Sequence, residues 1–544
     1  MLIDGRPLDA PAPPLNDLLR AGLDAHPEEP ALVSAVRSMS WRELEEESER
    51  LAGGYRALGL EAGDRIASLM PNRIALIVHY LACFKAGLVA TPLNYRYTHR
   101  EIDHALEVSG ARALLAHVER VEDVGESRLA AALPLGTIAY ADPEGSGEVG
   151  DVDWPHDFDR LLESRETAKT VPGEPFLRSR DEPQPDPSEP AAIFFTSGST
   201  GPAKGVTHTR SSLRWMIASA ADAFELDAED VFLPGSSMSH IGSFLWALSM
   251  LSAGGRVVVA RTFDSHELLP LLREQKPTVL AMIPAALLAL IRDHDLQAHD
   301  FDSLRVCRSG SDKVSTELLT EFAEVAGFPI VEGYGMTEVG LATLNPPSGV
   351  VKQGSIGRPI SGFSIALRGE DGEPVEAESV GRIWIRTPAA MAGYWQAPEA
   401  TEEVLREGWI DSGDLARADE EGYLWFFGRK KQVIVHDGSN ISPYEVEGAL
   451  NEHPAVALSG AVGIHDTAHG ENVRAYVTLR EGAERPSAAD LIVHCRERIG
   501  YKAPEEIVFL DEMPLNPTGK IDRAGLKKMA EDHLHPHGLG EATA

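Results

Sequence analysis

A segment rich in glycine and hydroxyl groups, residues 196–206, has the residue types needed to bind a phosphate. It reads TSGSTGPAKGV. Its glycines let the backbone turn sharply and bring N–H groups close to an anion, while four hydroxyls and Lys204 add hydrogen bonds and positive charge. The common Walker A spacing, G-x-x-x-x-G-K-[ST], does not occur in the sequence. We therefore predict a phosphate-binding loop of another type, with a plain polar surface loop as the alternative.

A second polar segment, residues 332–338, follows the apolar run at 328–331 and reads EGYGMTE. Its two glycines allow close approach of the backbone to a ligand, and Tyr334 offers a flat face for stacking. Thr337 and Glu338 supply a hydroxyl and a carboxylate, which are oxygen ligands suited to a phosphate-bound magnesium ion. The alternative is an ordinary Gly-Tyr-Gly turn.

Two further side chains have types that suit a nucleotide reaction. Asp414 ends the tight turn DSGD, and a carboxylate is a natural partner for ribose hydroxyls. Lys520 lies in a turn stiffened by proline and glycine, where a long cation could neutralise charge at a reacting centre. Taken alone, an ordinary loop and a solvated lysine explain these two equally well.

The elements expected to position these residues are alternating strands and helices. The apolar run 191–195 predicts a buried strand, so the phosphate loop leaves the end of a sheet, where open α/β folds bind ligands. Capping boxes at residues 40–43 and 98–101 predict two helix starts. Short β-branched runs at 257–259 and 278–280 predict further buried strands. The predicted fold class is α/β, with largely parallel sheets.

Two regions depart from this alternation. Residues 142–190 are rich in Gly, Pro, Asp and Glu, which predicts a surface excursion that is partly disordered. The tail from His533 onward also predicts disorder, with metal binding by its three histidines as the alternative.

Bulk properties exclude several classes of function. The 544 residues leave room for two or three domains. The net charge of −34 argues against a nucleic acid or an anionic membrane surface as the main partner. Three distant cysteines give no disulfide framework or zinc site. The chain shows no secretory signal and no apolar run long enough to span a membrane, so we predict a cytoplasmic protein.

Taken in order, these segments resemble the adenylate-forming superfamily, which includes acyl-CoA synthetases, luciferases and the adenylation domains of peptide synthetases. The resemblance covers nearly the whole chain. Besides the segments above, it rests on GDRI at 63–66, PN at 71–72, PLN at 92–94, GSIGRP at 354–359, GYW at 393–395, GRKK at 428–431, PYEVE at 443–447 and YKAP at 501–504.

The resemblance implies two domains and two half-reactions. A large N-terminal domain of layered sheets and helices, residues 1–428, would bind ATP and a carboxylic acid. A small mobile α+β domain, residues 429–544, would turn about a hinge near Lys431. ATP with Mg²⁺ would convert the acid to an acyl-adenylate, and the thiol of coenzyme A would then attack the acyl carbon.

The resemblance also assigns residue roles. Lys520 would bridge the attacking carboxylate and the α-phosphate, and His240 would adjoin that carboxylate, with helix capping as its alternative role. Thr337 would contact the α-phosphate, and Glu338 with Thr200 would hold Mg²⁺. The residues expected to bind nucleotide or coenzyme A are Thr196, Ser197, Gly198, Ser199, Thr200, Gly201, Lys204, Ser311, Glu332, Gly333, Tyr334 (against adenine), Gly335, Met336, Asp414 and Arg429 (at the ribose), and Gly438, Ser439 and Asn440 (beside pantetheine).

The sequence departs from the family pattern at two places. Ile434 is followed by Val435 where many relatives have Ile-Lys, and residues 309–313 read SGSDK where relatives often have Gly-Gly-Ala-Pro. The predicted acid pocket includes Trp246, Met336 and Leu341, which suggests an apolar acid, fatty or aromatic. Because no basic residue was identified in that pocket, we expect a monocarboxylic acid.

Other interpretations stay open. A stand-alone enzyme that loads an acyl carrier protein would need the same chemistry, and a homodimer is compatible with the sequence. A catalytically inactive nucleotide-binding protein is an alternative from another class, which the retention of Lys204, Glu338 and Lys520 disfavours.

Overall fold

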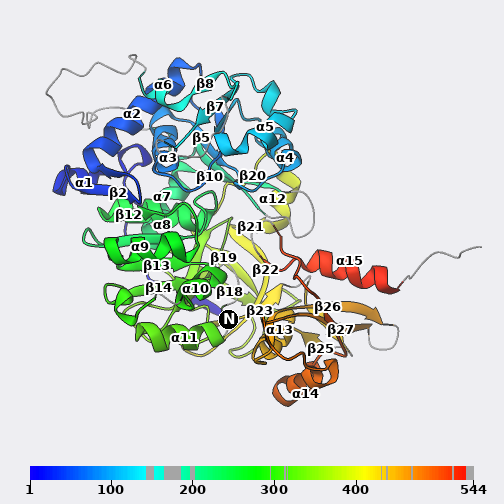
Figure 1. Ribbon diagram of the computed structural model, residues 1–544. Coiled ribbons are helices and arrows are strands. Elements are labelled where there is room, and N and C mark those ends of the chain that lie inside the picture. The colour runs from blue at the N-terminus through cyan, green and yellow to red at the C-terminus, as the bar shows by residue number, and fades with distance from the viewer. Residues whose placement is uncertain are drawn as a thin grey trace, which may run out of the picture.

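The computed structural model describes residues 1–142, 152–163, 185–196, 203–293, 296–310, 314, 316–429, 432–436, 439–466, 470–516 and 520–534. Within these ranges the strands form four sheets, and helices lie between and around them (Figure 1). Three sheets are built from strands up to Arg429 and the fourth from strands beyond it. The fold is therefore α/β with a large N-terminal and a small C-terminal domain, which confirms the predicted class.

A nine-stranded sheet positions much of the candidate site. From β15 to β2 its neighbouring strands run parallel. Because parallel strands present their carboxyl ends at one edge, β13, β14 and β15 open the same edge to a ligand. In spatial order the strands are β17 (Arg358–Pro359), β16 (Gly340–Leu344), β15 (Val331–Met336), β14 (Val306–Ser309), β13 (Val279–Met282), β11 (Val231–Gly235), β12 (Arg256–Val259), β2 (Pro30–Ser34) and β3 (Ser38–Ser40).

Helices cover both faces of this sheet. Alternate residues of a strand point to opposite faces, and on β13 Val279 packs with α7 and α8 whereas Leu280 packs with α9, α10 and α11. The two faces thus belong to separate buried clusters. The helices are α7 (Arg210–Ala223), α8 (Ile241–Ala253), α9 (Ser265–Gln275), α10 (Pro284–Ile291) and α11 (Thr316–Ala326).

An eight-stranded sheet carries the phosphate loop. Strands β9 and β10 pair antiparallel, with Phe195 opposite Gly205, so the loop joins the two arms of a hairpin at the end of the predicted strand. The spatial order is β20 (Gly393–Tyr394), β10 (Gly205–Thr209), β9 (Pro190–Phe195), β5 (Val89–Pro92), β4 (Arg65–Leu69), β6 (Ala113–His117), β7 (Thr137–Tyr140) and β8 (His156–Asp157).

The predicted helix starts are confirmed. Ser40 caps α2 (Trp41–Ala57) in a capping box with Glu43, and Thr98 begins α4 (His99–Ser109) in the same way with Glu101. The other helices of the N-terminal part are α1 (Arg20–Ala25), α3 (Ile74–Ala86), α5 (Val121–Glu126), α6 (Phe158–Leu162) and α12 (Pro398–Val404).

The remaining two sheets are antiparallel except for the parallel pair of β27 and β28, so parallel pairing holds for only part of the fold. A six-stranded antiparallel sheet comprises β1 (Leu2–Asp4), β18 (Ser364–Arg368), β19 (Gly381–Arg386), β22 (Trp409–Ala418), β21 (Leu405–Arg406) and β23 (Leu424–Arg429). The C-terminal sheet comprises β25 (Ser439–Ile441), β24 (Ile434–His436), β27 (Gly470–Leu479), β26 (Val456–Asp466) and β28 (Glu506–Phe509), with α13 (Pro443–Asn451), α14 (Ala488–Ile499) and α15 (Arg523–Leu534).

The predicted excursion at residues 142–190 contains regular structure. Strand β8 pairs with β7, and α6 packs on α2 closely enough that a Cβ at Gly54 would lie 2.5 Å from the Leu161 carbonyl oxygen. Residues 143–151 and 164–184 lie outside the described residues. The predicted disordered tail starts too early, since α15 continues through His533 to Leu534.

The three cysteines lie in the interior of the protein. Cys83, Cys307 and Cys495 are all buried free thiols. Among the described helices, none combines the length and the apolar character that crossing a bilayer requires.

Candidate active site

His240 stands at the entrance to α8, at the N-cap position. Its backbone is extended, with φ −101° and ψ 148°, but its side chain makes no capping hydrogen bond. The imidazole is therefore available to a ligand, although the residue does occupy the helix-capping position. Burial, and to a lesser degree the positive charge of Lys520, lowers the pKa of His240 to about 4. The side chain is thus neutral at physiological pH.

Asn72 fixes the loop that leads into His240. Its side-chain amide donates to the Ser236 carbonyl oxygen at 3.0 Å and its carbonyl oxygen accepts from the Met238 N–H at 2.8 Å. Both loop contacts come from one buried residue of the neighbouring sheet region. The position of His240 therefore depends on a segment far away in the sequence.

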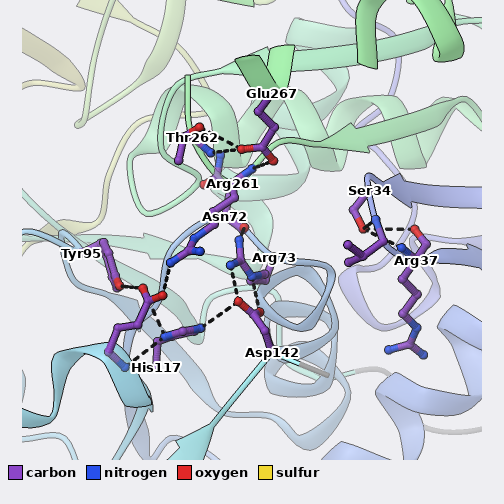
Figure 2. Close-up of polar contacts among 12 residues, drawn as sticks. Ser34, Arg37, Asn72, Arg73, Tyr95, His117, Asp142, Arg261, Thr262 and Glu267 are labelled. Atoms are coloured by element: carbon purple, nitrogen blue, oxygen red, sulfur yellow. Dashed lines mark hydrogen bonds and ion pairs between the residues drawn. The ribbon is translucent and has the colours of Figure 1, made fainter. Parts of the chain in front are cut away.

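A polar cluster holds the residues next to Asn72 (Figure 2). Arg73 forms two contacts of 2.5 Å with Asp142, whose second neighbour is His117 at 3.4 Å. Desolvation opposes ionisation of Asp142, but the hydrogen bonds and charges of Arg73 and His117 outweigh it and lower its pKa. The cluster continues through Glu119, which accepts from Tyr95 at 2.6 Å. It anchors the Asn72 segment by charge as well as by packing.

Glu338 is a buried carboxylate on the turn between β15 and β16. The Tyr394 hydroxyl donates to it at 2.7 Å, and the ammonium of Lys204 lies 4.9 Å from the centroid of the Tyr394 ring. Burial raises the pKa of Glu338, and the hydrogen bond from Tyr394 lowers it in part. Among the described residues, no cation forms an ion pair with this buried carboxyl group, and carboxylate oxygens of this kind suit a bound cation. The geometry thus links the phosphate-loop lysine to the predicted metal ligand.

Thr337 is held by the strand that follows the phosphate loop. His208 of β10 donates from Nε2 to the Thr337 carbonyl oxygen at 2.8 Å, and the Met391 N–H donates to the Glu338 carbonyl oxygen at the same distance. Strand β10 and the segment before β20 therefore fix the turn that carries the hydroxyl and the carboxylate. His208 is fully buried, and this desolvation lowers its pKa to about 4.

Tyr334, Asp414 and Arg429 form one group. The Tyr334 hydroxyl donates to Asp414 Oδ2 at 2.6 Å, and Arg429 Nε lies 3.3 Å from Asp414 Oδ1. Asp414 and Arg429 stand directly opposite each other on β22 and β23. The Tyr334 ring also stacks on Phe426, with centroids 6.2 Å apart. The three residues assigned to the nucleoside thus meet at one place.

Lys520 comes to this group from the C-terminal domain. Its turn is closed by the Asn516 side chain, which accepts from the Lys520 N–H at 3.1 Å. Burial raises the pKa of Asp414 and lowers that of His240, and the positive charge of Lys520 acts to lower the pKa of both groups. The structure therefore brings the expected catalytic lysine close to residues of the N-terminal domain that lie more than 100 positions earlier in the sequence.

The two glycines of β15 are required by the packing of the neighbouring strand, whereas the sequence suggested close approach to a ligand. A Cβ at Gly335 would lie 2.2 Å from the Gly340 carbonyl oxygen, and one at Gly333 would lie 2.6 Å from that of Thr343. Close approach of β16, in addition to any ligand, therefore requires glycine at both positions. Glu332 accepts from the Gly354 N–H at 3.0 Å, and Met336 ends the strand.

Some predicted residues cannot be placed in the site. Ser197, Gly198, Ser199, Thr200, Gly201, Ser311, Gly438 and the hinge residue Lys431 lie outside the described residues. Thr196 is described, and its N–H donates to the Lys204 carbonyl oxygen at 3.1 Å. Ser439 and Asn440 belong to β25, opposite His436 and Val435. The Val435 side chain, at the position where relatives carry lysine, is exposed.

One residue of the site was missed by reasoning from sequence. Arg308 is the third residue of β14, one position before the strand ends, and is only 8% exposed. Its guanidinium carbon lies 5.5 Å from the centroid of the Trp246 ring on α8. An arginine inside the apolar run of a buried parallel strand was the signal available in the sequence.

Known proteins resemble this chain over nearly its whole length. The sequence pattern of the AMP-binding enzyme family matches residues 19–395, and that of the AMP-binding enzyme C-terminal domain matches residues 445–520. A feruloyl-CoA synthase from Amycolatopsis sp is 32% identical over 504 residues, covering 91% of this chain and 96% of that protein. A fatty acid–[acyl-carrier-protein] ligase, ScoC, from Streptomyces coeruleorubidus is 32% identical over 514 residues, with 92% and 93% covered.

The fold has solved counterparts. The crystal structure of ATP-bound MatB from Rhodopseudomonas palustris superposes with a TM-score of 0.84 at 26% identity, covering 96% of this chain and 100% of that one.

Proposed function

The chain belongs to the family of AMP-binding enzymes and is an AMP-forming acid–thiol ligase, and we propose that it makes an acyl-adenylate from a carboxylic acid and ATP and passes the acyl group to coenzyme A. A carboxylate oxygen bonds to the α-phosphorus of ATP as the bond to pyrophosphate breaks. The thiolate sulfur then bonds to the acyl carbon, and AMP leaves. Activation is needed because a carboxylate is a poor electrophile, whereas AMP is a good leaving group.

The observation that carries the proposal is the convergence of Lys520, His240 and Asp414. Lys520 acts electrostatically on both other residues across the two domains. A cation at this point would neutralise charge that develops between two anions, the carboxylate and the α-phosphate. The neutral imidazole of His240 would lie beside the acid without adding a competing charge. These three residues fit the adenylation step.

The nucleotide would occupy the groups around Tyr334 and Lys204. Asp414 and Arg429 would bind the ribose, the Tyr334 ring would lie against the adenine, and Thr337 would contact the α-phosphate. Lys204 and the loop before it would hold the β- and γ-phosphates. The buried carboxylate of Glu338 fits a magnesium ion, with Thr200 as a further ligand. Such an ion would offset the charge repulsion between the carboxylate and the triphosphate.

The thioester step would use a second arrangement of the domains. We place the boundary after residue 428 and the hinge at Lys431, directly after β23. A few residues at such a hinge can absorb a large dihedral change. Gly438, Ser439 and Asn440 would then lie beside pantetheine. The proximity of Lys520 to Asp414 supports the first arrangement as the one seen in this structure.

For the acid we propose an apolar skeleton, fatty or aromatic. Trp246 on α8 and Leu341 on β16 are buried and apolar. Of the relatives described above, one is named as a feruloyl-CoA synthase and the other as a ligase of fatty acid and acyl-carrier-protein. We expected an acid with a single carboxylate because no basic residue was identified in the pocket. Arg308 is a basic residue beside Trp246, so that argument no longer holds.

An acyl carrier protein is the second candidate acceptor. It is favoured by the similarity to ScoC, whose name specifies acyl-carrier-protein. The chemistry up to the adenylate is the same for both acceptors. An inactive nucleotide-binding protein is disfavoured because Lys204, Glu338 and Lys520 are all present in the sequence.

The test is pyrophosphate release with ATP and Mg²⁺ over a panel of carboxylic acids, with and without coenzyme A. We expect acid-dependent release and sustained turnover with coenzyme A. Release that stops after one turnover and resumes with an acyl carrier protein would move the acceptor to that protein. Binding of ATP without release for any acid would contradict the proposed activity.

A further inference from the structure

Arg308 is buried, and among the described residues no anionic group forms an ion pair with its guanidinium. Within the part of the chain that the structure describes, it makes no hydrogen bond or ion pair, and its Nε is a buried donor without an acceptor. Glu332 is close enough to raise the pKa of Arg308, but burial has the larger effect and lowers it to about 10. Leaving a buried charge unpaired costs several kcal/mol in general, so such groups are retained where something binds them.

The position of Arg308 faces the candidate acid site. Alternate residues of β14 share a face, and Val306 packs in the same buried cluster as α8 whereas Cys307 packs in the other. Arg308 therefore points toward α8, as its contact with Trp246 confirms. A Cβ at Gly310 would lie 2.6 Å from an Nη atom of Arg308, so the guanidinium reaches the carboxyl end of the strand. This is the edge where the sheet opens to a ligand.

One helix connects this guanidinium to the reacting end of the acid. His240 is the N-cap of α8 and Trp246 lies six residues further on. At 1.5 Å per residue, the two are separated by roughly 9 Å along the helix axis. If the reacting carboxylate lies beside His240, an acid that runs along α8 brings its far end to Arg308. A spacer of a few carbon atoms or one aromatic ring suffices.

We propose that Arg308 binds a second oxyanion, a carboxylate or sulfonate, at the far end of the acid substrate. This inference rests on the proposed function for the position of the first carboxylate. A planar guanidinium makes two parallel hydrogen bonds to a carboxylate, which gives both affinity and orientation. Trp246 covers the apolar spacer and lies against the guanidinium. The substrate class is thus an acid with two anionic ends, in place of the monocarboxylic acid expected from sequence.

The first test compares matched acids in the unmodified enzyme. Adipate is paired with hexanoate, terephthalate with 4-methylbenzoate, and 4-sulfobenzoate separates a sulfonate from a carboxylate. We expect kcat/KM for pyrophosphate release to be about 100-fold higher for the doubly charged member of a pair, as a charge-assisted hydrogen bond predicts. Preference for hexanoate and 4-methylbenzoate would overturn the inference and leave the proposed function intact.

Variants of Arg308 give the second test. Arg308→Met should lower kcat/KM for the preferred dianion about 100-fold. The kcat/KM for the matched monocarboxylic acid should not fall. Arg308→Lys, which keeps a positive charge, should restore part of the loss. Arg368→Met is the matched control, because Arg368 lies 4.9 Å from the Trp384 ring on another sheet. An unpaired cation also predicts that Arg308→Met does not lower the melting temperature. A lower melting temperature with an unchanged acid preference would assign Arg308 a purely structural role.

A binding measurement separates this inference from the proposed function. Calorimetry with adipate or terephthalate is done with and without α,β-methylene-ATP, which cannot release pyrophosphate. Binding that is lost in Arg308→Met would support the inference even if no acid were adenylated. Equal binding by both proteins would overturn it.

Discussion

The Tyr334 hydroxyl donates a 2.6 Å hydrogen bond to Asp414 Oδ2, while Arg429 Nε lies 3.3 Å from Asp414 Oδ1. The carboxylate that we assign to the ribose is thus oriented by a hydroxyl at one oxygen and by a cation at the other. Burial raises the pKa of Asp414, and the charge of Arg429 and the hydrogen bond from Tyr334 lower it in part. Ribose binding should use the ionised form, whose oxygens only accept.

Tyr334→Phe should therefore make ATP binding more sensitive to acid. Loss of the hydrogen bond raises the pKa of Asp414 further, so protonation and loss of affinity occur at a higher pH than in the unmodified protein. The measurement is the Kd of ATP between pH 5 and 8. Tyr95→Phe is the control, because Tyr95 donates to Glu119 at the same 2.6 Å outside the site. An unchanged pH profile in Tyr334→Phe would separate Asp414 from ribose binding.

Lys520→Ala should slow adenylation by about 100-fold, or roughly 3 kcal/mol, by analogy with the loss of one donor at a developing oxyanion. Conversion of a supplied acyl-adenylate to thioester should change little, since Lys520 would act only in the first step. Both half-reactions are measured separately in single turnovers. Lys527→Ala, a half-exposed lysine paired with Glu471, controls for loss of surface charge. Equal loss in both half-reactions would contradict this role.

Tyr394→Phe removes the donor to Glu338 but keeps the ring beside Lys204. The pKa of Glu338 should rise further, which weakens binding of a cation, so the apparent KM for magnesium–ATP should increase several-fold. Titration of Mg²⁺ at fixed ATP measures this. Tyr423→Phe is a matched control. The Tyr423 hydroxyl also donates a hydrogen bond, to the Val350 carbonyl oxygen, and the ammonium of Lys352 lies 4.4 Å from the centroid of the Tyr423 ring. An equal effect of both changes would argue against a metal at Glu338.

Stability should fall as the pH decreases from about 6.5 to 4. The pKa of His208 is about 4 in the folded protein and 6.5 as a free side chain. Between these values the unfolded chain binds the proton and the folded protein does not, so acid favours unfolding, by up to about 3 kcal/mol for such a shift. Urea unfolding at pH 7, 5.5 and 4.5 tests this. His208→Gln should reduce the pH dependence without abolishing it, because the pKa of His240 is lowered in the same way. An unchanged slope would contradict the role of His208.

Gly335→Ala should destabilise the protein by roughly 2–4 kcal/mol, because the new Cβ would lie 2.2 Å from a backbone oxygen that cannot move freely. Thermal unfolding measures the change. Gly125→Ala is the control, since a Cβ there meets no atom within 4 Å. If Gly335→Ala kept its stability and lost only activity, ligand approach rather than strand packing would explain this glycine.

The sequence allowed prediction of individual elements better than of their arrangement. The strand before the phosphate loop and both capping boxes follow from local patterns of a few residues. The antiparallel sheet with Asp414 and Arg429 was not predicted, because strand pairing depends on residues distant in sequence. Strand β8 and helix α6 were not predicted within residues 142–190, because their flanks are rich in polar residues and proline.

For the candidate site, too, local motifs were predicted from the sequence but contacts between distant residues were not. Tyr334, Asp414 and Lys520 were identified from motifs and do come together. Arg308 was missed because β14 was assigned to the core from its apolar neighbours, and only burial and contacts show its charge to be unpaired. The support of His240 by Asn72 also needed the structure, since nothing local links the two.

The nine-stranded sheet has a consequence for how the chain folds. Its strand β2 pairs with β12, Leu32 opposite Val257, whereas strands β4 to β10 of another sheet lie between them in the sequence. Strand β3 can pair with one edge of β2 at once, but a growing or refolding chain must leave the other edge unpaired until the intervening region has been made. Contacts so distant in sequence slow folding and expose strand edges. Refolding from denaturant should be slow and favoured by low protein concentration, because the sheet that bears the active site is completed late.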